Sequence, residues 1–345
     1  MNKYILGILP MLLLASCSKE ADIKNIDSNK GVKITFTSGV NADMSLEIDK
    51  AKSRSIIENT YFSAGEQIGI YGIKSTADEM SLFDWTKENI VMQEYLDNAQ
   101  YEAKAFYNGS QLLKQNATPK FPDESGAALV FYAYYPYTAN VSYTAGNKTA
   151  PSIPVEIQST VEATPDYMYT GKKPVAADVA EKSVDVPLTF NHALGRLDFY
   201  IKTMVDNFTT APVLNKITVT TVEGQKGSMD ISTGEITINN SPETAATKVF
   251  EDSPNTNITI TSTLASKFMF IPAVDAIQKI ELALTNENGT PTEYTLYDKS
   301  TGAEAIKLVK GKTTKITINY TRTVNMTATV ETWVDGENDK EIDIN

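Results

Sequence analysis

The residues that most often carry chemistry are scarce in this sequence. His192 is the only histidine and Cys17 the only cysteine. Catalysis by a Ser–His or Cys–His arrangement would therefore depend on His192, and a zinc site, which needs several Cys or His ligands, has too few of them. His192 lies between two strand-like runs, which favours a structural role. The acidic residues of 335–339 (DGEND) lack the twelve-residue spacing of a calcium loop and indicate a turn.

Other site patterns are missing or weak. The sequence has no GxGxxG, and residues 224–228 (GQKGS) lack the spacing of a phosphate-binding loop. Carboxylates are abundant, so composition leaves open a pair of catalytic carboxylates as in a glycosidase, but no motif selects such a pair. We predict that the protein is not an enzyme and uses no metal and no cofactor. Its net charge of −12 makes nucleic acid an unsuitable partner.

The first residues are typical of an export signal. Lys3 supplies positive charge, residues 5–14 form an apolar run, and small residues precede Cys17. The run is shorter than the roughly 20 residues that span a bilayer. It resembles a lipoprotein signal peptide, which predicts that residues 1–16 are removed and that Cys17 carries acyl chains such as palmitate. More than one chain is needed for stable anchoring. The alternative is an ordinary secretory signal that contains a cysteine.

Short runs with period two dominate the rest of the chain. In residues 186–202, Leu197, Phe199 and Ile201 alternate with polar residues, which indicates a half-buried strand. Similar runs recur at short spacing, which is typical of β-sandwiches. We predict an all-β chain with two tandem β-sandwich domains. The expected division is a signal peptide over 1–16, a tether over 17–31, an N-terminal domain over 32–187 and a C-terminal domain over 188–345.

Several motifs together resemble one family. The pattern L-x-F-x-H-A-x-G-R-L-x-F-x-I at 188–201 resembles the central signature of the fimbrillins of Bacteroides-type bacteria, the type V pilins and their relatives. The fragments GEQIGIYGI (65–73), PDYMYTG (165–171) and TVETWVDGE (329–337) follow the order of the same family. The resemblance implies transthyretin-like sandwich domains and a structural subunit of a surface pilus (fimbria) that supports cell adhesion. It also implies an outer-membrane lipoprotein on the cell surface.

The resemblance also gives a role to the first strand. Val32, Ile34 and Phe36 alternate with polar residues and predict a strand with one apolar face. In fimbrillins, a trypsin-like protease cuts at a basic residue ahead of the GEQIG-type strand and releases the first strand with the tether. Arg54 is the candidate here, with Lys52 behind it. The alternative is a solvated linker whose charges have no role.

The chain also ends with an alternating strand. Its apolar positions are Val324, Met326, Ala328 and Val330. We expect this donor strand to fill the place of the first strand in a neighbouring subunit, which is donor-strand exchange. The expected partners are other pilin subunits, the outer membrane through the lipid anchor, the protease and host surface ligands. The alternative is a monomeric outer-membrane lipoprotein that binds a glycan or a host protein.

Overall fold

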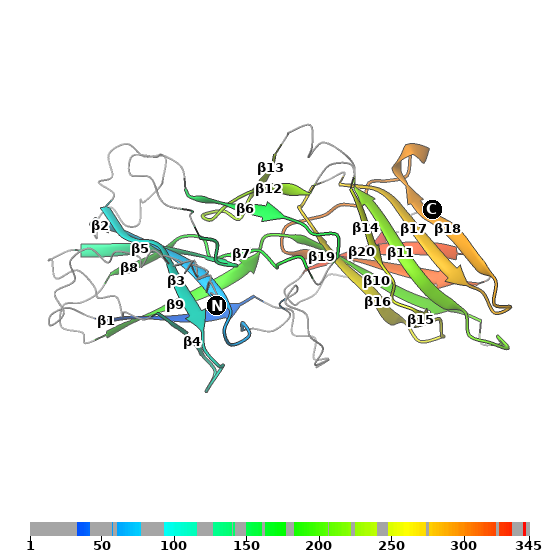
Figure 1. Ribbon diagram of the computed structural model, residues 1–345, viewed down its shortest axis with the longest axis horizontal. Helices are drawn as coiled ribbons and strands as arrows, with labels where there is room; N and C mark the ends of the chain where they lie inside the picture. Colours follow the sequence, from blue (N-terminus) through cyan, green and yellow to red (C-terminus); the bar gives the residue numbers. More distant parts are fainter. Residues whose placement is uncertain are drawn as a thin grey trace, which may run out of the picture.

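Strands make up nearly all of the regular structure. The computed structural model describes residues 33–41, 57, 61–76, 93–115, 127–139, 141, 150–160, 163–176, 183–205, 207–221, 225–239, 248–273, 276–321, 324–332 and 341–342. Within these ranges the helical structure is confined to the 3-10 turn η1 (Lys299–Thr301), so the predicted all-β class is confirmed. Figure 1 shows two strand-rich lobes along the long axis, with a small sheet between them. Cys17, Val32 and Arg54 lie outside the described residues.

One eight-stranded sheet forms the N-terminal lobe. Its strands are β1 (Lys33–Val40), β2 (Gln67–Thr76), β3 (Gln93–Ala103), β4 (Gln111–Lys114), β5 (Ala127–Tyr135), β7 (Met168–Tyr169), β8 (Lys173–Ala176) and β9 (Ser183–His192). They are ordered β2-β3-β4-β1-β9-β7-β5-β8, and β2 also pairs with β5. That last pairing closes the sheet on itself and leaves only β8 outside the circuit. In this order β1 lies between β4 and β9, so it has a neighbour on each edge.

The C-terminal lobe contains two facing sheets. Its strands are β10 (Gly195–Thr203), β11 (Val213–Thr221), β14 (Val249–Asp252), β15 (Thr256–Asn257), β16 (Thr263–Phe270), β17 (Ile277–Thr285), β18 (Pro291–Asp298), β19 (Lys312–Tyr320), β20 (Val324–Thr332) and β21 (Glu341–Ile342). One sheet has the order β16-β10-β19-β20-β21, and the other has the order β14-β11-β17-β18, with β15 paired to β11. Phe199 and Ile316 of the first sheet share a core with Ile217 and Ile280 of the second. Both sheets therefore bury the apolar residues that the sequence places at every second position.

A three-stranded sheet links the two lobes (Figure 1). It is formed by β6 (Ser152–Glu156), β12 (Lys226–Asp230) and β13 (Ile236–Ile238), in the order β13-β12-β6. Pro154 of β6 lies opposite Ser228 of β12, so strands from the two halves of the sequence pair directly. The predicted division of the chain at 187/188 stays a prediction, and β9 runs through those residues.

Two hydrophobic cores stabilise the molecule. The smaller one lies inside the N-terminal sheet and includes Ile34, Phe36 and Phe190. The larger one fills the C-terminal lobe and continues under the linking sheet to Tyr132 of β5. Strand β5 thus buries one face in each core, as expected for a strand that is apolar on both faces.

Candidate functional site

The first strand occupies the interior of the N-terminal sheet. β1 pairs in parallel with β9 from Lys33↔Ser183 to Val40↔Phe190, and antiparallel with β4 through Phe36↔Leu113 to Ser38↔Gln111. Its inward side chains, at Ile34, Phe36, Ser38 and Val40, are all buried. A strand with partners on both edges and one buried face fills a groove that would be open without it. We call the space between β9 and β4 the β1 groove.

Phe36 provides the largest apolar contact in the β1 groove. Its ring meets Tyr101 edge-to-face, with 5.2 Å between centroids and an interplanar angle of 83°. It meets Phe131 in the same way at 4.9 Å and 84°. Edge-to-face pairs of this kind stabilise a core beyond the area that they bury. The pocket that holds Phe36 is therefore formed by rings on β3 and β5 of the N-terminal sheet.

A buried polar residue, Gln111 of β4, lies on one wall of the β1 groove, directly opposite Ser38. Gln111 has no exposed surface. Its Oε1 accepts the Ser38 hydroxyl at 3.0 Å and the Phe62 N–H at 2.8 Å. Its Nε2 donates to Phe62 O at 2.6 Å and to Lys104 O at 2.7 Å. The amide thus uses two acceptor and two donor positions, which satisfies a buried polar group.

The chain on both sides of the predicted cleavage region is held at one end of β9. The Asn41 N–H donates to Phe190 O at 3.0 Å, and Asn41 Nδ2 donates to Asn191 Oδ1 at 2.6 Å. On the other side, the Ile57 N–H donates to Asp166 Oδ2 at 3.0 Å. Asp166 in turn contacts His192, the last residue of β9. Arg54 therefore belongs to a segment whose described flanks are fixed close together.

His192 contributes to this anchor. The side chains of His192 and Asp166 are 1% and 0% exposed, and His192 Nδ1 lies 3.1 and 3.0 Å from the two carboxylate oxygens. This contact supports the structural role that the sequence favours for His192. Sequence reasoning missed Asp166 and Gln111, because each has a role only through partners that are distant in the chain. The PDYMYTG motif, which contains Asp166, was the only available signal for either residue.

The predicted donor strand belongs to the other lobe. β20 pairs along its whole length with β19, from Lys312↔Thr332 to Tyr320↔Val324. Among the described residues, its other edge pairs only with the two-residue β21. Val324 is half-buried against the larger core. Figure 1 shows β1 and β20 in opposite lobes, so the structure does not bring the predicted donor and the β1 groove together within one molecule.

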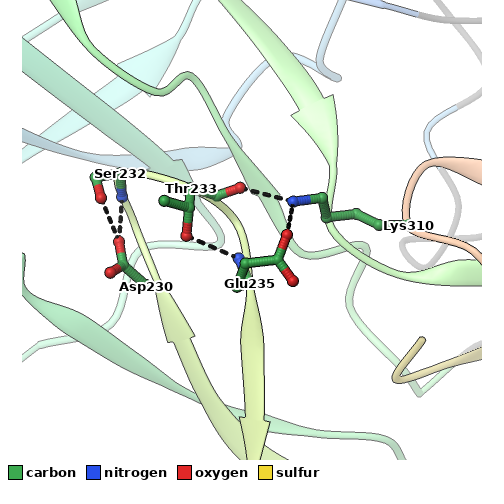
Figure 2. Close-up of polar contacts among 5 residues, drawn as sticks. All are labelled: Asp230, Ser232, Thr233, Glu235 and Lys310. Carbon is green, nitrogen blue, oxygen red and sulfur yellow. Dashed lines mark hydrogen bonds and ion pairs between the residues drawn. The ribbon is translucent and has the colours of Figure 1, made fainter. Parts of the chain in front are cut away.

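A polar cluster fixes the β12–β13 turn between the lobes (Figure 2). Lys310, just before β19, donates from Nζ to Thr233 O at 2.8 Å and pairs with Glu235. The same Nζ lies 5.3 Å from the ring centroid of Tyr169 on β7. Asp230 Oδ1 accepts the Ser232 N–H at 2.7 Å and so holds the turn in shape. The cluster therefore connects β7 of the N-terminal lobe with the C-terminal lobe.

Within the described ranges, no three His, Cys, Asp or Glu residues are grouped as a metal site would need. Nor does the described part of the chain contain a helix that is long and apolar enough to cross a bilayer.

Known structures share this fold. A candidate cell adhesion protein of Bacteroides ovatus is 16% identical, with a TM-score of 0.55 over 89% of this chain and 99% of its own. A second one, of Bacteroides uniformis, is 18% identical, with a TM-score of 0.54 over 89% and 100%. A fimbrial protein of Bacteroides vulgatus is 13% identical, with a TM-score of 0.53 over 87% and 99%. At such identities the likeness concerns the fold alone.

No curated protein matches the chain in sequence. The family model described as fimbrillin-like does match it, over residues 53–333. This match covers both lobes and most of the chain, and the chain therefore belongs to the fimbrillin-like family.

Proposed function

We propose that the protein is a structural subunit of a cell-surface pilus that supports adhesion. In this proposal it is exported as a lipoprotein through Cys17 and is activated when a trypsin-like protease cuts after Arg54. The β1 strand then leaves, and a neighbouring subunit's C-terminal strand replaces it. Membership of the fimbrillin-like family supports the pilus role, as do solved relatives named fimbrial or cell adhesion proteins.

The observation that carries the proposal is the position of β1. It is paired on both edges and buries Ile34, Phe36 and Val40. Loss of this strand would leave unpaired backbone groups on β9 and β4 and empty apolar pockets between them. Refilling one such pocket contributes roughly 1.5–3 kcal/mol. The vacated groove is therefore a strong acceptor for an extended segment.

The uncut protein is protected by the same strand. While β1 is in place, it covers the edges of β9 and β4 that border the groove, so another chain cannot pair there. After cleavage, a donor from a second molecule fills the groove of the first, whose own donor remains available for a third. Such a head-to-tail contact does not close on itself and so builds a fibre.

The donor strand has to leave its own sheet for this exchange. In the free subunit β20 is fully paired on one edge, and within the described ranges its other edge pairs only with β21. In the β1 groove it would be paired along β9 and also at β4, as β1 is. The exchange therefore replaces one set of ladder hydrogen bonds with a similar set, and the filled pockets supply the driving force.

Limited trypsin treatment of the purified precursor tests the proposal. We expect a product that begins at Ser55 and forms polymers whose amount rises with protein concentration, measured by N-terminal sequencing and electron microscopy. The matched control is the triple variant Lys50→Gln/Lys52→Gln/Arg54→Gln, which removes every basic residue of 41–57 and should stay monomeric after the same treatment. A wild-type product that begins at Ser55 and stays monomeric would contradict the exchange and favour a monomeric surface lipoprotein.

A further inference from the structure

We infer that Gln111 sets the register of the strand that fills the β1 groove, and that Ala328 of a second copy of this chain lies against it. In this register Val324, Met326, Ala328 and Val330 take the places of Ile34, Phe36, Ser38 and Val40. The inference rests on the proposed function, which names the donor but not its alignment.

The hydrogen bonds of Gln111 hold its amide beside the position of Ser38. Four bonds satisfy its amide, and just one of them, from the Ser38 hydroxyl, comes from β1. Without β1, the bonds to Phe62 and Lys104 still hold the amide in place. An alanine in the position of Ser38 leaves Oε1 bonded to the Phe62 N–H, so no buried polar group loses its last partner.

Larger side chains do not suit this position. The buried amide is bonded on both sides to the backbone of Phe62 and Lys104, so it cannot move aside without breaking those bonds. A methionine or valine here would press on the amide, and overpacking of a filled core is destabilising. The β1 groove thus accepts large side chains at the positions of Ile34 and Phe36 but requires a small one at the position of Ser38.

The donor sequence has its one small apolar residue at the matching place. Along the alternating face, β1 reads Ile, Phe, Ser, Val, and the C-terminal strand reads Val, Met, Ala, Val. A shift of two residues in either direction would bring Met326 or Val330 onto Gln111. Only the unshifted alignment sets a long, flexible side chain in the Phe36 pocket and a methyl group at Gln111.

The same comparison fixes the direction of the donor. β1 runs parallel to β9. If the donor ran the other way with Ala328 still at Gln111, Thr332 would take the buried place of Ile34 and Val330 that of Phe36. A hydroxyl would then enter an apolar pocket and the Phe36 pocket would be underfilled, both of which are unfavourable. The donor therefore runs parallel to β9, as β1 does.

Engineered disulfides test this register. In the structure Thr37 of β1 lies opposite Leu112 of β4, whose side chain is exposed. The inferred alignment brings Thr327 of the donor to the position of Thr37. We would mix Thr327→Cys donors with Leu112→Cys acceptors after trypsin treatment, both in a Cys17→Ser background. We expect a disulfide-linked dimer on a non-reducing gel.

The matched controls are Asn325→Cys and Thr329→Cys donors with the same acceptor. A shift of two residues moves a strand by about 7 Å, beyond the reach of a disulfide without backbone movement. Each control should therefore cross-link at least tenfold less. Polymers that cross-link mainly through a control position would overturn the register but leave the proposed function standing. If no variant and no wild-type protein polymerised, both proposals would fail.

A second pair of variants tests Gln111 without cysteine chemistry. Ala328→Leu adds bulk at the position opposite Gln111, while Ala211→Leu adds the same bulk at an exposed position outside the donor strand and the β1 groove. We expect Ala328→Leu to reduce polymer yield about tenfold and Ala211→Leu to change it less than twofold. Urea unfolding of each uncut variant shows whether its own fold is intact. Equal polymer yields from two folded variants would contradict the inference.

Discussion

His192 Nδ1 lies 3.0 Å from Asp166 Oδ2 in a fully buried pair, and the same carboxylate oxygen accepts the Ile57 N–H at 3.0 Å. The pair therefore joins the end of β9 to Ile57. The sequence singles out His192 only as a lone histidine. In the structure it orients a carboxylate that holds Ile57, three residues after Arg54.

Loss of this carboxylate should be costly. In Asp166→Ala, the His192 ring and the Ile57 N–H lose a buried acceptor, so we expect the free energy of unfolding to fall by about 3 kcal/mol. Urea denaturation measures this change, and hydrogen exchange at Ile57 should accelerate. The control is Glu251→Ala, which removes an exposed partner 3.1 Å from Lys216 and should change stability by less than about 1 kcal/mol. Equal effects of the two variants would refute an anchoring role.

Two buried tyrosines differ in the role of their hydroxyl groups. The Tyr134 hydroxyl contacts Asn98 Oδ1 at 2.6 Å and accepts the Thr138 N–H at 3.2 Å. The Tyr101 hydroxyl has no hydrogen-bond partner among the described residues. We expect Tyr134→Phe to lower the free energy of unfolding by about 1–2 kcal/mol and Tyr101→Phe to change it by less than about 0.5 kcal/mol. Thermal or urea unfolding compares them, and a larger loss for Tyr101→Phe would contradict this assignment.

The turn between β12 and β13 depends on a glycine. Gly234 has a φ of +70°, and a Cβ there would lie 2.1 Å from Tyr169 Cε1. Gly234→Ala therefore combines backbone strain with a clash against the ring next to Lys310, and should destabilise by about 2–3 kcal/mol. Gly289→Ala is the control, because its φ is +74° but nothing lies within 4 Å, and it should cost about 1 kcal/mol. If urea unfolding gave the same loss for both, the ring contact would not matter.

The parts of the fold that follow from local pattern were predictable from the sequence. Alternation over 186–202 predicted two strands with a break, and the structure has β9 and β10 on either side of Ala193 and Leu194. The Asn288-Gly289 dipeptide favours a hairpin, and it lies in the turn between β17 and β18. In both cases the residues that carry the sequence pattern are the same residues that form the strand or the turn.

Other parts could not be derived, because they depend on residues far apart in the chain. The stretch 84–100 has no clean hydrophobic period, yet its described part, 93–100, is strand in β3, since pairing with β2 overrides weak local preference. The β6–β12 pairing and the partners of Gln111 leave no periodic signal either. Of the candidate site, the sequence predicted the strand with Ile34 and Phe36, but not the Gln111 amide beside that strand.

High pH should destabilise the protein through its buried tyrosines. Burial raises the pKa of Tyr71, Tyr101 and Tyr134 well above its usual value near 10. In the unfolded chain these phenols ionise from about pH 10, whereas in the folded protein they stay protonated to higher pH. Their contribution to stability is therefore complete below about pH 10 and declines as the pH rises above it. Urea unfolding as a function of pH should show this decline, and ultraviolet absorbance should show phenolate of these three tyrosines only as the protein unfolds. Their ionisation near pH 10 in the folded protein would contradict the effect of burial.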